Sequence, residues 1–200
     1  MNVQKSSITG IILVGGKSRR MGNDKAFLEI EGIPLFERVL QAMMENFTSI
    51  LLIGDCRERY AHYDLPVVAD LYPGSALGGL YSGLVSASTE FVFVAPCDMP
   101  FPSAALIRLI YSKADHFDAV VPRTSAGLEP LFALYRKSCL EPIRRLLETG
   151  NYRVFDFFPE VKVRYLDAEE MNRVADGERT LLNINTPQEF AMLKEKLKCP

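Results

Sequence analysis

The chain has 200 residues, of which 48% are hydrophobic and 24% charged, a composition typical of one globular domain with a sizeable core. Its formal net charge of −2 excludes the strongly basic surface that recruits nucleic acids or anionic membranes, so any anion site must be local. The sequence has neither the roughly 20 consecutive apolar residues of a membrane-spanning helix nor the ordered regions of a signal peptide. Cysteines at 56, 97, 139 and 199 are too far apart for a metal knuckle or a dense disulfide framework. We therefore expect a cytoplasmic monomer without nucleic-acid or membrane partners.

Apolar runs of strand length alternate with helical patterns along the chain. The runs with strand character cover residues 8–14, 49–54, 66–69, 91–96, 118–122 and 131–135. Helical patterns cover 34–47, 80–87, 102–113, 138–147 and 187–197. This alternation predicts a single doubly wound α/β domain over residues 1–200, with a mostly parallel sheet and helices on both faces. In such folds ligands bind at the carboxyl ends of the strands.

The segment 150–180 is less periodic and more charged than the rest of the chain. We expect it to be an excursion of the same domain on the substrate side.

A loop rich in glycine and cations follows the first strand and reads LVGGKSRRMGNDK. Gly10 lies one residue too far from Gly16-Lys17-Ser18 for a P-loop, and Gly15, Gly16 and Gly22 lack the spacing of a dinucleotide fingerprint. Two interpretations remain, namely a solvated basic surface loop and a polyphosphate site.

In the polyphosphate site, the glycines bring backbone N–H groups close to the ligand, while Arg19, Arg20 and Lys25 neutralise its charge. The position of this loop directly after a buried-type strand favours the polyphosphate site.

Two aspartates follow other apolar runs. Asp98 lies between prolines after FVFVA, where a single carboxylate suits Mg²⁺, which prefers one or two carboxylates together with phosphate oxygens and waters. Asp70 follows PVVA and precedes Pro73-Gly74. For both aspartates the alternative is a turn role, in which the carboxylate bonds to its own backbone.

Near the C-terminus, Asn183 and Asn185 alternate around Ile184, so on a strand both amides would face one side. Their alternative role is to cap the following helix. Thr186 before Pro187 is a standard helix start, so we expect Thr186 to cap and the asparagines to face the site.

The pattern L-x-G-G-x-x-x-R-M-G-x-D-K resembles the signature of the small nucleotidyltransferases that make molybdopterin dinucleotide cofactors, above all the molybdenum cofactor guanylyltransferases (MobA family). The resemblance covers almost the whole chain. It includes Asp70 with the glycines after it, PCDMP around Asp98, EPL at 129–131, YRV around Arg153, and the closing NINTP. The family usually has Ala at the position of Val14 and often has an Asn after the second strand, where this chain reads LIGD.

The resemblance implies a Rossmann-like nucleotidyltransferase fold and transfer of GMP from GTP to the terminal phosphate of molybdenum-molybdopterin, with Mg²⁺ as cofactor. It adds maturation factors of molybdoenzymes as candidate partners. It implies catalytic roles for Lys25, Asp98 and one of Arg19 or Arg20, of which we select Arg20, and makes Asp98 the metal ligand. The pterin side receives Arg153, Asn183 and Asn185. The implied GTP-binding residues are Leu13, Val14, Gly15, Gly16, Lys25, Asp70 and Asp98.

Three alternatives stay open. A molybdopterin cytidylyltransferase uses CTP and typically has an Ala-Ala-Gly version of the loop, whereas this chain has Gly15-Gly16. Sugar-1-phosphate nucleotidyltransferases share the loop type, but they are usually longer and use a second late Asp. A carrier that binds molybdopterin or a nucleotide without turnover would not need the carboxylate of Asp98.

Overall fold

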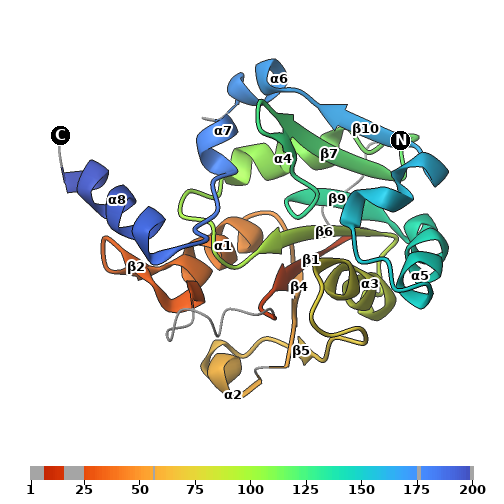
Figure 1. Cartoon of the computed structure of the whole chain (residues 1–200), viewed down its shortest axis with the longest axis horizontal. Coiled ribbons are helices and arrows are strands. Elements are labelled where there is room, and N and C mark those ends of the chain that lie inside the picture. The colour runs from red at the N-terminus through yellow and green to blue at the C-terminus, as the bar shows by residue number, and fades with distance from the viewer. Residues whose placement is uncertain (1–6, 16–24, 56, 175–176, 199–200) are drawn as a thin grey trace.

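The computed structural model describes residues 7–15, 25–55, 57–174 and 177–198. Its main sheet has the strand order β10-β7-β9-β6-β1-β4-β5, with β8 paired to β7 (Figure 1). The strands β1, β4, β5, β6, β7 and β10 run parallel, and β9 is antiparallel to both of its neighbours. The bounds are β1 Ile8–Leu13, β4 Ser49–Ile53, β5 Val67–Val68, β6 Phe91–Pro96, β7 Ala119–Thr124, β8 Gly127–Leu128, β9 Ala133–Arg136 and β10 Val163–Leu166.

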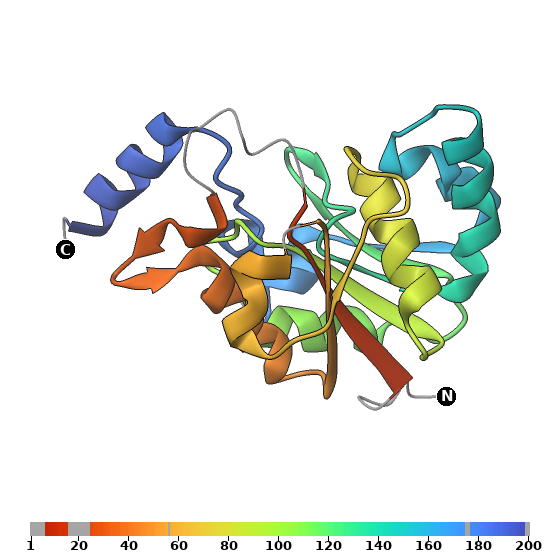
Figure 2. The same cartoon turned by 90° about the horizontal axis from the view of Figure 1, so that it is seen from below.

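Helices cover both faces of this sheet, as the sequence predicts (Figures 1 and 2). The core on one face is built with α1 and α4, and the core on the other with α3, α5 and the 3-10 helix η6. These helices are α1 Leu35–Met44, α3 Ala76–Ser86, α4 Ala104–Ser112, α5 Leu140–Glu148 and η6 Val154–Glu160. Shorter helices are η3 Lys25–Phe27, α2 Arg57–Tyr60, η4 Ala61–Tyr63, η5 Lys137–Cys139, α6 Ala168–Asn172 and α7 Gly177–Thr180.

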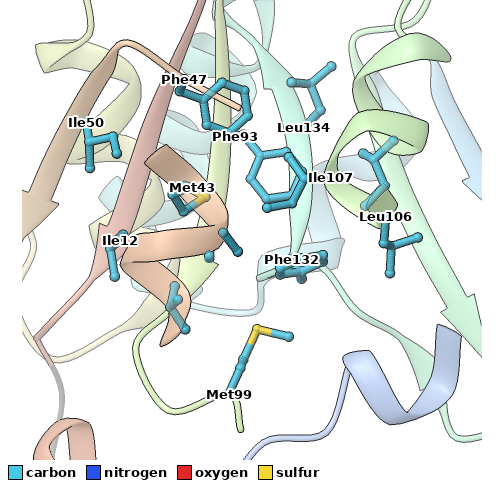
Figure 3. Packing of buried hydrophobic residues seen from close by; sticks show 14 of the residues in the cluster. Ile12, Met43, Phe47, Ile50, Phe93, Met99, Leu106, Ile107, Phe132 and Leu134 are labelled. Atoms are coloured by element: carbon cyan, nitrogen blue, oxygen red, sulfur yellow. The ribbon is translucent and has the colours of Figure 1, made fainter. Parts of the chain in front are cut away.

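The core under α1 and α4 is built around an aromatic group on β6. The ring of Phe93 lies 5.6 Å from that of Phe47 and 5.1 Å from that of Phe132, measured between centroids. Met43 and Leu106 bring apolar side chains from the two helices to the same cluster (Figure 3). Such edge-to-face and tilted ring pairs add to the free energy gained from burial alone.

Helix α3 packs close to the other face of the sheet because two of its glycines, Gly79 and Gly83, lie against strand side chains. A Cβ at Gly83 would lie 2.3 Å from the Cδ1 atom of Ile11 on β1, and one at Gly79 would lie 3.0 Å from the Cδ2 atom of Leu13. The sequence predicts this helix from residue 80. It begins at Ala76, because the Ser75 hydroxyl accepts a hydrogen bond from the Gly78 N–H and caps the helix there.

The expectation that 150–180 is an excursion needs correction for residues 163–166. This part of the segment is β10, the edge strand of the sheet, parallel to β7. Asp118 fastens its start, since one carboxylate oxygen accepts a hydrogen bond from the Lys162 N–H at 2.9 Å and the other from the Ser138 hydroxyl. The strand was missed because its side chains are only half-buried until Leu166, so its hydrophobic pattern is weak.

A C-terminal arm stands outside the two main cores. Helix α8 (Pro187–Lys198) packs on the hairpin formed by β2 (Glu29–Ile30) and β3 (Ile33–Pro34), and both lie at one side of the molecule (Figures 1 and 2). A small third core of Ile30, Leu35 and Ile184 joins them. Across the described part of the chain, no helix has the length and apolar character to span a membrane.

We predict that Gly78→Ala destabilises the protein by about 1–3 kcal/mol, even though Ala is the better helix former. A Cβ at this position would lie 2.1 Å from the backbone oxygen of Tyr72, so the 71–75 loop must move. Urea denaturation measures the change. Ser86→Ala, at an exposed position on the same helix, is the control and should stay within about 0.5 kcal/mol of the parent. Equal stability of G78A and S86A would contradict this close packing.

Candidate active site

A pocket of about 290 Å³ opens at the carboxyl ends of the central strands. The chain leaves β1 toward β4 on one side, whereas β6 lies on the other side of β1, so the loops after β1 and β6 diverge around a crevice. This is the topological switch point at which open α/β sheets bind ligands. The pocket is lined by Leu13, Gly15, Ile53, Asp70, Gly74, Ser75, Ala76, Gly79, Pro96, Cys97, Asp98, Leu131, Asn183 and Asn185.

The floor of the pocket is backbone that β1 and β4 hold together. The N–H groups of Val14 and Gly15 both donate to the carbonyl oxygen of Ile53, at 3.0 and 3.2 Å. Gly54 is required beside them, because a Cβ on this residue would lie 2.6 Å from the Gly15 nitrogen and its φ is +155°. The loop after β1 therefore starts from a rigid position.

Val14 points away from this floor. Its side chain is only 7% exposed and belongs to the core on the α1 side, whereas Leu13 and Gly15 line the pocket. The alternation of side chains along a strand accounts for the difference between Leu13 and Val14. Where the family usually has Ala, the larger side chain of Val14 therefore packs into the core.

Asp98 lies just beyond the carboxyl end of β6. The strand ends at Pro96, and the next apolar side chain, that of Met99, is 1% exposed and inserts into the core under α1 (Figure 3). The backbone oxygen of Asp98 accepts a hydrogen bond of 3.2 Å from the Ile184 N–H. The backbone of Asp98 is thus held by the strand, by the buried Met99 and by the C-terminal segment.

Burial raises the pKa of Asp98 above its ordinary value of 3.8. The nearby positive charge of Lys25 and a backbone hydrogen bond oppose this rise. Lys25 begins η3, which directly precedes the hairpin of β2 and β3. The structure therefore brings together a half-buried carboxylate and an ammonium group that are 73 positions apart in the sequence (98 − 25).

Asp70 uses one carboxylate oxygen to build the adjacent loop. Its Oδ1 accepts hydrogen bonds from the Tyr72 N–H and from the Ser82 hydroxyl, both at 2.9 Å. The turn role considered for Asp70 is therefore real, and it coexists with a position on the pocket wall. Oδ2 takes no part in these two bonds.

The first turn of α3 forms the wall next to Asp70. Ser75 and Ala76 line the pocket, so the amino end of an 11-residue helix faces it. Backbone N–H groups and the helix dipole make such an end favourable for phosphate.

Asn183 and Asn185 form the opposite wall, together with Leu131. They lie on an irregular segment, so the strand geometry considered for them does not apply, although both residues do line the pocket. Thr186 caps α8, because its Oγ1 accepts a hydrogen bond of 3.1 Å from the Glu189 N–H. This leaves both asparagines to the pocket, and the buried Oδ1 of Asn183 has no hydrogen-bond partner among the described residues.

Arg153 is not among the residues that line the pocket. It is exposed, follows α5, and its guanidinium lies 5.4 Å from the ring centroid of Phe155. Gly16, Arg19 and Arg20 lie outside the described residues, so the structure leaves their predicted roles as predictions.

Several residues of the pocket wall are not among the predicted site residues, above all Ile53, Cys97 and Leu131. The apolar ones carry no chemical signature and look like core residues. Only their position after a strand could have indicated them. In the described segments, no three His, Cys, Asp or Glu side chains are grouped to bind a metal, so a cation here would need ligands from a substrate or water.

Comparison with known proteins gives a consistent result. The family model described as "MobA-like NTP transferase domain" matches residues 10–163. A "Molybdenum cofactor guanylyltransferase" of Desulfosudis oleivorans is 32% identical over 195 residues and covers 96% of each chain. A "Probable molybdenum cofactor guanylyltransferase" of Pelotomaculum thermopropionicum is 37% identical over 183 residues, which are 91% of this chain and 89% of the relative.

A solved structure shares the fold. The molybdopterin-guanine dinucleotide biosynthesis protein A of Archaeoglobus fulgidus superposes with a TM-score of 0.82 at 23% identity, over 95% of this chain and 98% of the other.

We predict that Lys25→Met raises the pKa of Asp98 further, because the positive charge that opposes the effect of burial is removed. The carboxylate would then form only at higher pH, and the acid limb of any activity that needs it would move the same way. Carbon-13 NMR of the Asp98 carboxyl measures the shift. Lys113→Met is the control, because Lys113 lies at the C-terminal end of α4, away from the carboxyl ends of the strands where Asp98 lies. An Asp98 pKa that is equal in K25M and K113M would show that Lys25 does not act on this carboxyl.

Proposed function

This chain belongs to the MobA-like NTP transferase family, and from that premise we propose that it transfers GMP from GTP to the terminal phosphate of molybdenum-molybdopterin. The observation that carries the proposal is the pocket at the switch point. One of its walls has a helix amino end and Asp70, its floor is backbone of β1 and β4, and Asp98 lies at its rim. This arrangement suits a nucleoside triphosphate, and the polar side chains of Asn183 and Asn185 are available to a second substrate.

The proposed reaction needs no protein nucleophile. A phosphate oxygen of molybdopterin attacks the α-phosphorus of GTP in line, the new P–O bond forms, and the bond to the bridging oxygen breaks with release of pyrophosphate. A phosphate monoester has its second pKa near 6, so it is already largely ionised at pH 7 and needs no general base. Positioning and neutralisation of charge then supply the catalysis.

Asp98 is the residue that would hold Mg²⁺. A single half-buried carboxylate fits this ion, which takes one or two carboxylates and completes its shell with phosphate oxygens and water. When bound, the ion supplies positive charge to the triphosphate. The remaining charge comes from the chain itself, from Lys25 and from Arg20 or Arg19 of the glycine-rich loop, which offset the charge that develops on pyrophosphate.

Nucleotide recognition is assigned to the floor and to the α3 wall. Leu13, Gly15 and Gly16 bring backbone groups to the base, so guanine is read without a diagnostic side chain. Asp70 is proposed to hold the nucleotide through the oxygen that the Tyr72 and Ser82 hydrogen bonds leave over. The amino end of α3 favours a phosphate beside it.

The acceptor is assigned to the opposite wall. Asn183 and Asn185 carry amide groups that donate to and accept from a polar ring system such as a pterin. The unpartnered Oδ1 of Asn183 supports this assignment, because a buried acceptor without a donor costs free energy that a ligand N–H would recover. Arg153 remains a proposed acceptor residue, although it does not line the pocket.

We predict that Asp98→Asn lowers turnover by at least about a hundredfold, whereas GTP affinity falls by less than about tenfold, because the lost charge matters most in the transition state. Pyrophosphate release measures turnover, and calorimetric titration measures GTP binding. Asp115→Asn is the matched control, on the loop between α4 and β7. Near-parent turnover of D98N would refute the role of Asp98.

The reaction itself is tested with purified protein, molybdenum-molybdopterin, Mg²⁺ and either GTP or CTP. We expect pyrophosphate and the guanine dinucleotide from GTP only. A product from CTP alone would identify a cytidylyltransferase with the same mechanism. Binding of both substrates without product from either would identify a carrier and refute the enzyme.

A further inference from the structure

Ile184 connects three parts of the molecule that the sequence keeps apart. Its N–H donates to the backbone oxygen of Asp98 at 3.2 Å. Its side chain is 4% exposed and lies in the small third core with Ile30 and Leu35. Its two neighbours in sequence, Asn183 and Asn185, both line the pocket.

The third core also reaches the nucleotide side. Ile30 is on β2, and Leu28, which packs against the same cluster, donates its N–H to the Lys25 oxygen at 3.1 Å. Helix α8 contributes Phe190, Leu193 and Leu197, which pack against the same cluster. One small apolar cluster thus supports both the segment that carries Lys25 and the segment that carries the two asparagines.

The register between this cluster and the pocket is fixed by hydrogen bonds. Glu189 Oε2 accepts from the N–H groups of Asn185, at 2.6 Å, and Thr186, at 3.2 Å, while the Glu189 N–H donates to Thr186 Oγ1. This is a capping box. Because residues 183–186 lie on no strand of the sheet, the cap, the Asp98 hydrogen bond and the third core hold them in place.

We propose that Ile184 is a positioning residue for the acceptor side. Its side chain in the third core and its N–H on Asp98 together form a joint, through which the C-terminal arm sets the distance between the Asn183 and Asn185 amides and Asp98. The inference rests on the proposed function for the identity of the acceptor. Asp70 and α3, which build the nucleotide wall on the main sheet, do not belong to the third core, whereas Lys25 is linked to that core through Leu28. Loss of the joint therefore acts on acceptor binding far more than on GTP binding.

The test compares apolar-to-Ala substitutions inside and outside the third core. Ile184→Ala removes the side chain from the third core but keeps the N–H that donates to Asp98, and Ile184→Val should keep most of the apolar packing. Leu193→Ala weakens the anchor from α8 without altering the 183–185 segment, and Met192→Ala, 59% exposed on the same helix, is its matched control. Ile143→Ala on α5 empties an equally buried site on the other side of the sheet, so it controls for general loss of stability.

Three quantities are measured for each variant. They are the KM for molybdenum-molybdopterin, the equilibrium affinity for GTP, and the NMR shifts of the Asn183 and Asn185 side-chain amides in the protein without ligands. For I184A we expect an acceptor KM raised about tenfold or more, moved amide resonances and a GTP affinity within about threefold. L193A should show a smaller change of the same kind, whereas I184V, M192A and I143A should match the parent.

An acceptor KM and amide shifts in I184A that match those of the parent would overturn the proposal, and so would an equal rise of KM in I143A. Should I184A not fold, L193A against M192A decides in the same way. The amide shifts separate this inference from the reaction, because they report on the joint even if the parent protein makes no dinucleotide from GTP.

Discussion

The close packing of α3 on β1 and β4 is the constraint on which the pocket depends. Gly79 and Gly83 let the helix approach the strands, Gly78 lets it approach the loop at Tyr72, and Gly54 and Gly15 let the two strand ends touch through backbone alone. Close contact brings the amino end of α3 and Asp70 to the edge where β1 ends. The crevice of the switch point is thereby narrowed to a pocket with a backbone floor, which suits a ligand recognised by backbone groups.

Around this pocket, burial and charge act against each other at Asp98. Burial disfavours the carboxylate and raises the pKa of Asp98, whereas the positive charge of Lys25 favours the carboxylate and opposes that rise. The same balance suits a site that receives a cation together with a polyanion. Asp98 follows β6 of the main sheet, and Lys25 begins η3, directly before the β2–β3 hairpin. The distance between the two charged groups therefore depends on how this hairpin packs against the rest of the molecule.

The proposed acceptor wall can be built from an irregular segment because the C-terminal arm holds that segment in place. The main sheet positions the nucleotide side directly, through strand ends and a helix start. The acceptor side has no strand beneath it and depends on a peripheral core of a few apolar side chains and one capping box. In the proposed assignment the two walls therefore have different supports, since the nucleotide wall is continuous with the large core and the acceptor wall is attached to it through Ile184.

The sequence by itself determined the class of fold, most strands, the helix cap at Thr186 and the identity of the chemically distinctive residues, because local patterns of burial and charge are written in neighbouring residues. It failed where the signal is weak, as at the half-buried edge strand Val163–Leu166. Only the tertiary structure decided that Val14 faces the core while Leu13 faces the pocket, that Arg153 lies off the pocket, and that Lys25 acts on Asp98. Those facts depend on contacts between distant segments, which are set by packing and not by local sequence.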